Sequence, residues 1–339
     1  MTVKKVSIKD VARRAEVSYA TASAILNGRD KQLSIDDSIA RKVKHAVKEL
    51  GYVPNPIATS LKSGKSRTIA LVVDDISSPI FSVVAGIIES EARKFNYAVI
   101  CCSTAKHPES GRRVLRLLEQ RHIDGYIIVP FKELGPDIQS LQKSRKPVVL
   151  VNHYVKTPSP IAYVITDEYA DIFEGVRFLA GKGYKRIALI TQATDPQLQI
   201  NGYKDALHTE DIPFARKYVK KLALGLTDKA REANILHFLR THREVEALLL
   251  VQEGVALAGL NVLKFLKMNV PGDIAVLCYA DHLLFSLHDP AISVMRPPVE
   301  EMALHAIQLL IRQLSDPGHI PGEAHRYALR SRLIIRESA

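Results

Sequence analysis

The stretch Val17–Asn27, which reads VSYATASAILN, sets the organisation of the N-terminal region. Ser18 is a favourable helix N-cap, because a Ser hydroxyl can accept a backbone N–H of the first helical turn. The apolar positions at helical spacing are Ala22, Ile25 and Leu26. The dipeptide Asn27-Gly28 is a typical stop signal. The stretch therefore predicts a short helix with an apolar inward face. The positions expected to face outward are Tyr19, Ala20 and Ser23.

Capping signals place one helix before this stretch and another after it. Ser7-Ile8-Lys9-Asp10 has the form of a capping box, in which the Ser and Asp side chains satisfy backbone N–H groups at a helix start. This first helix is expected to end near Glu16. The run Ser34–Asp37 caps a third helix, which Gly51 ends. Two short helices joined by a tight turn, with a third that completes a small core, are typical of a helix-turn-helix unit.

The basic residues of the chain are concentrated in the same region. The 339-residue chain has a net charge of +11, and residues 1–67 contribute +8 of it, from 14 Lys and Arg against six Asp and Glu. Binding to a phosphate backbone favours such an uneven distribution. We therefore expect the polar N-terminal face of the Val17–Asn27 helix to lie in the DNA major groove, with phosphates held by basic side chains and helix N-termini. Periodicity alone would also allow a three-helix domain that binds protein, and the charge disfavours that alternative.

From residue 68 onward, short apolar runs alternate with segments of helical periodicity. The expected strands are Ile69–Val73, Ala98–Cys102, Tyr126–Val129, Val148–Val151, Ile187–Ile190, Ala247–Val251 and Ile274–Cys278. The expected helices are Phe81–Phe95, Ser110–Arg121, Ala170–Lys182, Asn201–Thr209, Lys229–His242 and Ala256–Lys267. Buried β-branched strands that alternate with helices predict an α/β fold with parallel sheets flanked by helices.

This α/β region could belong to an enzyme or to a binding protein, and its motifs do not favour an enzyme. The first strand is followed by Asp74–Pro79 rather than by a Gly-rich dinucleotide-binding loop. The sequence contains no Gly-x-Ser-x-Gly elbow and no His-Glu-x-x-His motif. His282 and His288 lie close in sequence but lack ligand spacing with Cys or acidic residues. We expect no catalytic residues, no metal and no cofactor.

The cysteines and the hydropathy pattern suggest a compartment. Cys101, Cys102 and Cys278 form neither a disulfide framework nor a metal-binding spacing, and all three are expected to be buried core thiols. This usage suits a reducing cytoplasm. No apolar run reaches the ~18 residues or more of a membrane span, and no apolar segment follows the basic N-terminus as in a signal peptide.

At this point the sequence resembles the lactose/galactose repressor (LacI/GalR) family. The N-terminal residues that carry the resemblance are Ile8–Ala12, Val17-Ser18, Ala20-Thr21, Ser23, Leu26–Gly28 and Glu49–Asn55. Further landmarks are Asp75–Ser77, Pro79, Phe81, Asp124-Gly125, Pro147–Val149, Gly183-Tyr184, Arg186-Ile187, Gly202-Tyr203, Ala206-Leu207, Val270-Pro271, Asp273 and Leu333–Ser338. The resemblance covers nearly the whole chain. It implies a helix-turn-helix domain, a hinge helix, and a two-lobed α/β domain like that of periplasmic binding proteins.

The resemblance also implies boundaries. The DNA-binding domain would span 1–54, and the hinge helix with its linker 55–67. The effector-binding and dimerisation domain would span 68–339. Its lobe proximal to DNA would comprise about 68–164 and 296–323, and its distal lobe about 165–295 and 324–339.

The resemblance implies DNA contacts as well. The residues at the family's contact positions are Ser7, Ser18, Tyr19, Ala20, Thr21, Ser23, Ala24, Asn27, Asn55, Ala58 and Leu61. Base contacts are expected from Tyr19 and Ala20. Ala24 stands where the family often has a basic residue and can offer only a methyl contact. In the hinge, Asn55 and Pro56 suit the cap and first turn of a short helix. Leu61 is expected to wedge between base steps in the minor groove.

The effector site departs from the family pattern. The residues expected to line it are Ser77, Phe81, Asn152, Asp167, Gln199, Gln252 and Asp281. Gln199 stands in place of the usual Arg, Gln252 in place of an Asn, and Ala280 in place of an acid. Three explanations stay open: a less polar effector, a repressor without an effector or modulated by a protein, and an offset in the register.

The sequence thus predicts a transcriptional repressor that binds a pseudo-palindromic double-stranded operator as a cytoplasmic homodimer. A small-molecule effector, a sugar or related metabolite, would control it from between the lobes by preferring one lobe arrangement. No membrane partner is expected. The alternative is a small-molecule-binding or catalytic α/β protein whose basic N-terminal domain serves another role.

Overall fold

The computed structural model describes residues 6–53, 64–105, 107–193, 196–316 and 325–339. The chain divides into two compact units, residues 1–67 and residues 68–339. Asn55, Ala58 and Leu61 lie outside the described residues, so the expected hinge helix stays a prediction. Within the described ranges, no helix combines the length and apolar character needed to cross a membrane.

The first unit is a three-helix domain made of α1 (Ile8–Arg14), α2 (Tyr19–Leu26) and α3 (Asp37–Leu50). Its core is closed by side chains from each helix, among them the fully buried Val11, Ala22 and Val43. The helices are short, and they are stable because each buries one face against the other two.

The helix ends of this unit follow the capping signals. The Ser7 backbone N–H and hydroxyl donate to Asp10 Oδ2 at 2.9 and 2.6 Å. The third helix is capped by Asp36, whose Oδ1 accepts the backbone N–H of Ser38 at 2.7 Å. Gly51 ends that helix in the left-handed conformation, with φ 61°. The predicted order of three helices is confirmed.

The second unit contains two six-stranded sheets. Sheet A has the order β11-β5-β4-β3-β1-β2 and sheet B the order β12-β10-β9-β8-β6-β7. The strands of sheet A are β1 (Thr68–Val73), β2 (Ala98–Ser103), β3 (Gly125–Ile128), β4 (Val148–Val151), β5 (Ala162–Thr166) and β11 (Arg326–Leu329). Those of sheet B are β6 (Ile187–Thr191), β7 (Val219–Lys221), β8 (Ala247–Val251), β9 (Ala275–Tyr279), β10 (Ser293–Arg296) and β12 (Arg332–Ile334). The pairs are parallel, as in β1–β2 and β8–β9, except for the antiparallel pair β10–β12.

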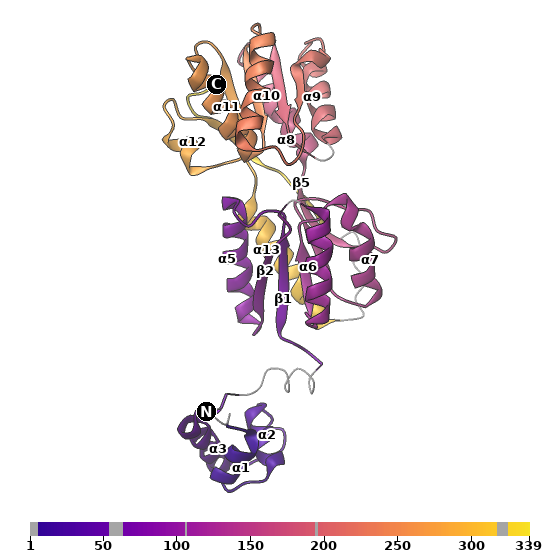
Figure 1. Ribbon diagram of the computed structural model, residues 1–339, viewed down its shortest axis with the longest axis vertical. Coiled ribbons are helices and arrows are strands. Elements are labelled where there is room, and N and C mark those ends of the chain that lie inside the picture. The colour runs from indigo at the N-terminus through magenta and orange to yellow at the C-terminus, as the bar shows by residue number, and fades with distance from the viewer. Residues whose placement is uncertain (1–5, 54–63, 106, 194–195, 317–324) are drawn as a thin grey trace. The chain divides into compact units, whose positions relative to one another are not determined.

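Helices cover both faces of each sheet, and each sheet with its helices forms one lobe. In the first lobe, α5 (Pro79–Lys94) and α13 (Val299–Ser315) pack on one face of sheet A, and α6 (Pro108–Gln120) and α7 (Gly135–Lys143) on the other. Figure 1 shows α5 and α6 on opposite sides of β1 and β2.

The second lobe has the same layered plan. On one face of sheet B lie α8 (Glu168–Gly181) and α9 (Gln197–Thr209). On the other face lie α10 (Asp228–Thr241), α11 (Glu253–Leu266) and the short α12 (Leu283–Leu287). The expected α/β fold with parallel sheets flanked by helices is confirmed.

Two details differ from the sequence-based expectations. Strand β11 pairs with β5 in sheet A, so residues 326–329 belong to the first lobe, although the expected boundary placed 324–339 in the distal one. The elements that the hydropathy pattern did not single out include β5, β7 and β10. β7 (VKK) and β10 (SVMR) are short and polar at half or more of their positions, and β5 alternates buried with half-buried residues. Their placement depends on pairing with distant strands.

The expectation that all three cysteines are buried core thiols is wrong for two of them. Cys278 is fully buried, whereas Cys101 is exposed and Cys102 half-buried. Both belong to β2, which is the edge strand of sheet A and pairs only with β1. An edge strand is covered less than an internal one, so an apolar composition does not guarantee burial.

Two buried tyrosines of the second unit differ in whether their hydroxyl has a hydrogen-bond partner, so they allow a matched test of what such a bond contributes to stability. The Tyr126 hydroxyl has no hydrogen-bond partner among the residues that the structure describes, whereas the Tyr203 hydroxyl donates to the backbone carbonyl of Ile187 at 2.8 Å. An unsatisfied buried polar group costs about 1–3 kcal/mol, so Tyr126→Phe should leave the free energy of unfolding unchanged or raise it slightly. Tyr203→Phe should lower it by about 1 kcal/mol.

Urea denaturation of the two variants measures this difference. A loss in Tyr126→Phe as large as in Tyr203→Phe would show that a bound water satisfies the Tyr126 hydroxyl.

Candidate DNA interface and effector site

The N-terminus of α2 presents a polar, exposed surface. Ser18 caps the helix, since its Oγ accepts the backbone N–H of Thr21 at 3.0 Å and lies 2.8 Å from the Thr21 hydroxyl. Tyr19 follows as the first helical residue, with 55% of its surface exposed, and Ala20 is exposed beside it. The helix start therefore brings together four of the expected contacts, Ser18 to Thr21, on one accessible end.

Ser23 does not face outward as expected. It is 7% exposed, and Ala24 is buried beside it at 9%. The reason is that α2 packs against both α1 and α3, so its inward surface is wider than the stripe of Ala22 and Ile25. Asn27, the C-cap, is exposed and donates from Nδ2 to the Ser23 carbonyl oxygen at 2.5 Å. The middle of α2 thus packs against the rest of the domain and does not offer these side chains to DNA bases.

The basic residues of this unit outnumber its acidic ones by eight, so ion pairs within the unit cannot neutralise all of them. Among the described residues, ion pairs join Arg13 to Asp10 at 3.7 Å and Arg14 to Glu49 at 2.8 Å. These pairs are exposed, and exposed pairs are only weakly stabilising. The net positive charge of the unit therefore remains available for contacts with phosphates.

In the second unit, most of the expected effector residues directly follow strands. Asn152 follows β4, Asp167 follows β5, and Gln252 follows β8. Asp281 lies two residues beyond β9. Ligands of open α/β sheets bind outside the carboxyl ends of parallel strands, which is where these side chains stand.

Two of the expected effector contacts are buried inside the fold. Phe81 is 7% exposed and packs into the core between α5 and sheet A, rather than offering a free ring face. Gln199 has no exposed surface: its Oε1 accepts the Thr191 hydroxyl at 2.5 Å, and its Nε2 donates to Glu168 Oε2 at 3.1 Å. In this conformation neither side chain is accessible to a ligand.

The other expected effector residues also make internal bonds. Gln252 Oε1 accepts the backbone N–H of Gln192 at 3.0 Å, and Asp167 caps α8 by accepting the backbone N–H of Ala170 at 3.1 Å. The Ser77 hydroxyl donates to Asp75 Oδ1 at 2.6 Å. These bonds fix the loops at the strand ends.

Asp281 and Asn152 have charged or titratable neighbours. Asp281 lies 3.4 Å from the Arg336 guanidinium and 3.7 Å from that of Arg296. Asn152 Nδ2 lies 3.3 Å from His153 Nε2, and Asn152 has a left-handed backbone with φ 69°. The single acid that the sequence retained after β9 is therefore neutralised by two arginines of its own unit.

Sequence reasoning missed other groups at these strand ends. His282 Nε2 lies 3.7 Å from Glu253 Oε1. Arg231 donates to Gln192 Oε1 at 3.0 Å and to Asp228 Oδ1 at 2.5 Å. No motif signals the pairs His282–Glu253 and Arg231–Gln192, because their partners lie in different segments of the second lobe. Among the described residues, no cluster of three or more His, Cys, Asp or Glu could hold a metal ion.

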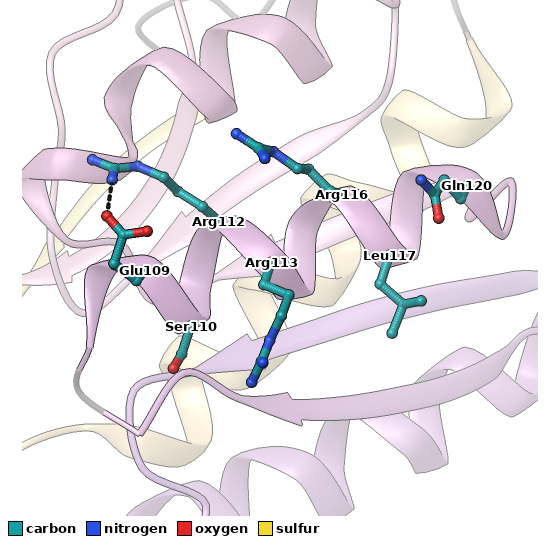
Figure 2. A pocket seen from close by; sticks show the side chains of 7 residues that line it. All are labelled: Glu109, Ser110, Arg112, Arg113, Arg116, Leu117 and Gln120. Carbon is teal, nitrogen blue, oxygen red and sulfur yellow. Dashed lines mark hydrogen bonds and ion pairs between the residues drawn. The ribbon is translucent and has the colours of Figure 1, made fainter.

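A shallow groove of about 540 Å³ lies on α6, and none of the expected effector residues lines it. It is lined by Glu109, Ser110, Arg112, Arg113, Arg116, Leu117 and Gln120. Figure 2 shows Arg112 and Arg116 directed to one side of the helix, and Arg113 and Leu117 to the other. Because one helix supplies every lining residue, the groove is a space between exposed side chains and not an enclosed site.

Comparisons with known proteins agree with both halves of this description. Residues 7–55 match the family model of bacterial regulatory proteins of the lacI family, and residues 176–339 match that of the periplasmic binding protein-like domain. The transcriptional regulator RegA of Clostridium saccharobutylicum is 28% identical over 98% of each chain. The ribose operon repressor of Halalkalibacterium halodurans is 25% identical, covering 98% of this chain and 96% of that one.

A solved structure shows the same fold. The lac repressor dimer bound to operator and an anti-inducer aligns with a TM-score of 0.84 at 20% identity, over 99% of both chains. The three-helix first unit and the two-sheet second unit thus have the fold of this solved structure. The chain thus has a DNA-binding domain of the lacI type of bacterial regulatory proteins together with a periplasmic-binding-protein-like domain, and it is a DNA-binding transcriptional regulator.

Proposed function

We propose that this regulator is a repressor that binds a pseudo-palindromic operator as a cytoplasmic homodimer and that a small molecule controls its affinity for DNA. The observation that carries the DNA part is the exposed start of α2, where Ser18, Tyr19, Ala20 and Thr21 stand on a domain with a net charge of +8. Ser7 and Asn27 are proposed as further contacts. A two-fold site would be read by one α2 helix in each half.

Selection from random double-stranded DNA, followed by footprinting, tests the DNA part. We expect protection of a two-fold site of about 16–20 base pairs, with affinity that falls steeply as salt rises. Binding without sequence preference, or binding insensitive to salt, would contradict the proposal.

For the effector we propose a sugar or related metabolite at the carboxyl ends of the strands of the two lobes. The support is the set of polar side chains that follow β4, β5, β8 and β9. Similar proteins include a ribose operon repressor and a regulator solved in complex with cellobiose, which is 24% identical to this chain with a TM-score of 0.72. Because Gln199 and Phe81 are buried, polar contacts would come chiefly from Asn152, Gln252 and Asp281.

A thermal-shift screen of sugars, sugar phosphates, nucleosides and uronic acids tests the effector. A ligand that binds only the folded state raises the melting temperature, by an amount that grows with the logarithm of its concentration above its Kd. An effector must in addition change the affinity for the selected operator. A stabilising compound that leaves the affinity for the operator unchanged is not the effector.

An apolar patch on α12 supports the homodimer. Leu283 and Leu287 are 73% and 70% exposed, and Leu284 lies between them in sequence with 53% exposed. Exposed apolar side chains gathered on one element are typical of protein interfaces. Leu287→Asp should weaken the dimer about 100-fold, because a buried unpaired carboxylate adds its desolvation to the lost apolar contact.

Sedimentation equilibrium of the wild type and of this variant gives the dimer dissociation constant. Leu198→Asp is a matched control, since Leu198 is also exposed but lies on α9. A wild-type protein that is monomeric at micromolar concentration, or equal losses in both variants, would contradict the assignment to α12.

A further inference from the structure

The polypeptide passes between sheet A and sheet B three times within the second unit. The first link joins β5 to α8, the second joins β10 to α13, and the third joins β11 directly to β12. The third link joins two strands and consists of only two residues, Arg330 and Ser331. A segment this short must bend sharply at few bonds if the lobes change their relative orientation.

A buried carboxylate of α8 holds this third link. Asp171 has no exposed surface. Its Oδ1 accepts the Ser331 backbone N–H at 3.0 Å and the Arg330 guanidinium at 3.2 Å. Its Oδ2 accepts the Ser331 hydroxyl at 2.5 Å and the Tyr279 hydroxyl at 2.9 Å. Four donors on one carboxylate therefore join α8, β9 and the link.

The same contact is extended at its surface. The Arg330 guanidinium also donates to Glu174 Oε2 at 2.8 Å and to the Ala170 carbonyl oxygen at 3.3 Å, both on α8. Burial, and to a lesser extent the neighbouring Asp171 carboxylate, raises the pKa of Tyr279, so its hydroxyl stays protonated and remains a donor.

The residue before the link belongs to the other sheet. Leu329 pairs with Thr166 in sheet A, and its carbonyl oxygen accepts the backbone N–H of Asp167 at 2.9 Å. The chain thus changes from the hydrogen bonds of sheet A to those of the second lobe between Leu329 and Arg330. Free rotation in this link is therefore confined to the backbone bonds between Leu329, which is held by sheet A, and Arg330, which is held by the second lobe.

We propose that Asp171 is a positioning residue that clamps the third link to the second lobe and so restricts the lobes to a narrow range of relative orientations. This proposal rests on the proposed function, because an effector can control DNA binding only if the lobes have distinct arrangements that it can favour. Without the clamp, Arg330 and Ser331 gain rotational freedom, and the lobes sample orientations that no effector selects.

Distance distributions between the lobes of the full-length protein test the proposal without DNA or effector. Spin labels on a keto-bearing unnatural amino acid at Arg116 of α6 and Arg240 of α10 leave the native cysteines in place. Both positions are exposed and lie in different lobes. Pulsed electron–electron double resonance should give a measurably broader distribution for Asp171→Asn than for the wild type.

Glu246→Gln is the matched control. Glu246 also accepts several donors, the backbone N–H groups of Lys185 and Arg186 at 2.8 and 2.9 Å and the Arg186 guanidinium, but these lie within the second lobe. This variant should lose stability while its distance distribution keeps the wild-type width. If Asp171→Asn does not fold, Arg330→Gln removes the exposed part of the clamp and should broaden the distribution less.

The outcomes separate this proposal from the proposed function. An unbroadened distribution in folded Asp171→Asn and Arg330→Gln, or equal broadening in Glu246→Gln, overturns the clamp even if operator binding is found. Broadening confined to the clamp variants supports it even if the effector screen fails.

Discussion

Tyr19→Ala is expected to weaken binding to the selected operator by about 10- to 100-fold, because a well-placed base contact contributes about 1–3 kcal/mol of discrimination. Tyr19 is the first residue of α2, directly after the Ser18 cap, and more than half of its surface is exposed. Its ring makes little contribution to the core of the domain, so the loss should fall on binding rather than on folding. Binding to unrelated DNA depends chiefly on the phosphate backbone and should change little.

Fluorescence anisotropy with operator and with scrambled DNA, at matched salt, measures both affinities. Leu33→Ala is the control. Leu33 is 61% exposed in the same unit, but it belongs to the segment that connects α2 to α3 and not to α2 itself. An equal loss on operator and scrambled DNA would mean that Tyr19 contacts the backbone only. A fall in the melting temperature of the first unit would mean that the ring stabilises the fold.

Gly202→Ala should lower the free energy of unfolding of the second unit by about 3 kcal/mol, at the upper end of the usual cost of overpacking. Gly202 lies in α9, where an added Cβ would overlap the carbonyl oxygen of Tyr169 in α8 and lie 3.3 Å from the Phe173 backbone nitrogen. Both obstacles are backbone atoms, which cannot move aside as a flexible side chain could. Relief of the clash requires the two helices to separate and opens the core beneath them.

Gly86→Ala provides the opposite expectation in the same unit. Gly86 lies in the middle of α5, and an added Cβ there would meet no atom within 4 Å. Because Gly destabilises a helix interior relative to Ala, this change should raise stability by about 0.5–1 kcal/mol. Thermal and urea denaturation of both variants compare the two. A Gly202→Ala variant as stable as the wild type would show that α8 and α9 can repack at no cost.

Local sequence determined the elements whose stability depends on near neighbours. The Ser7–Asp10 box, the Ser18 cap and the Gly51 stop are interactions over a few residues, so their pattern was sufficient to place the three helices. Long buried runs such as Ile69–Val73 likewise predicted internal strands. The concentration of positive charge in residues 1–67 pointed to DNA before any geometry was known.

The side-chain environments followed a different rule. Helical periodicity placed Ser23 outward, but α2 is covered by two helices, and a periodic pattern does not give the width of the covered face. Cys101 lies in a strand with the apolar composition of a core strand, but it is exposed because β2 is the edge strand of sheet A. The order of strands in a sheet is set by pairing between distant segments, which local patterns do not encode.

The effector region shows the same division. Position along the chain correctly placed Asn152 and Gln252 directly after strands, since those two strands were recognisable. It did not show that the Gln199 side chain is hydrogen-bonded to Thr191 and Glu168, or that Asp281 forms ion pairs with two arginines. The sequence by itself thus determined the class of the protein, its helix caps and the strand ends where polar side chains gather. Only the tertiary structure decided which of those side chains remain accessible and that Asp171 meets Ser331, because these contacts join residues up to 160 positions apart.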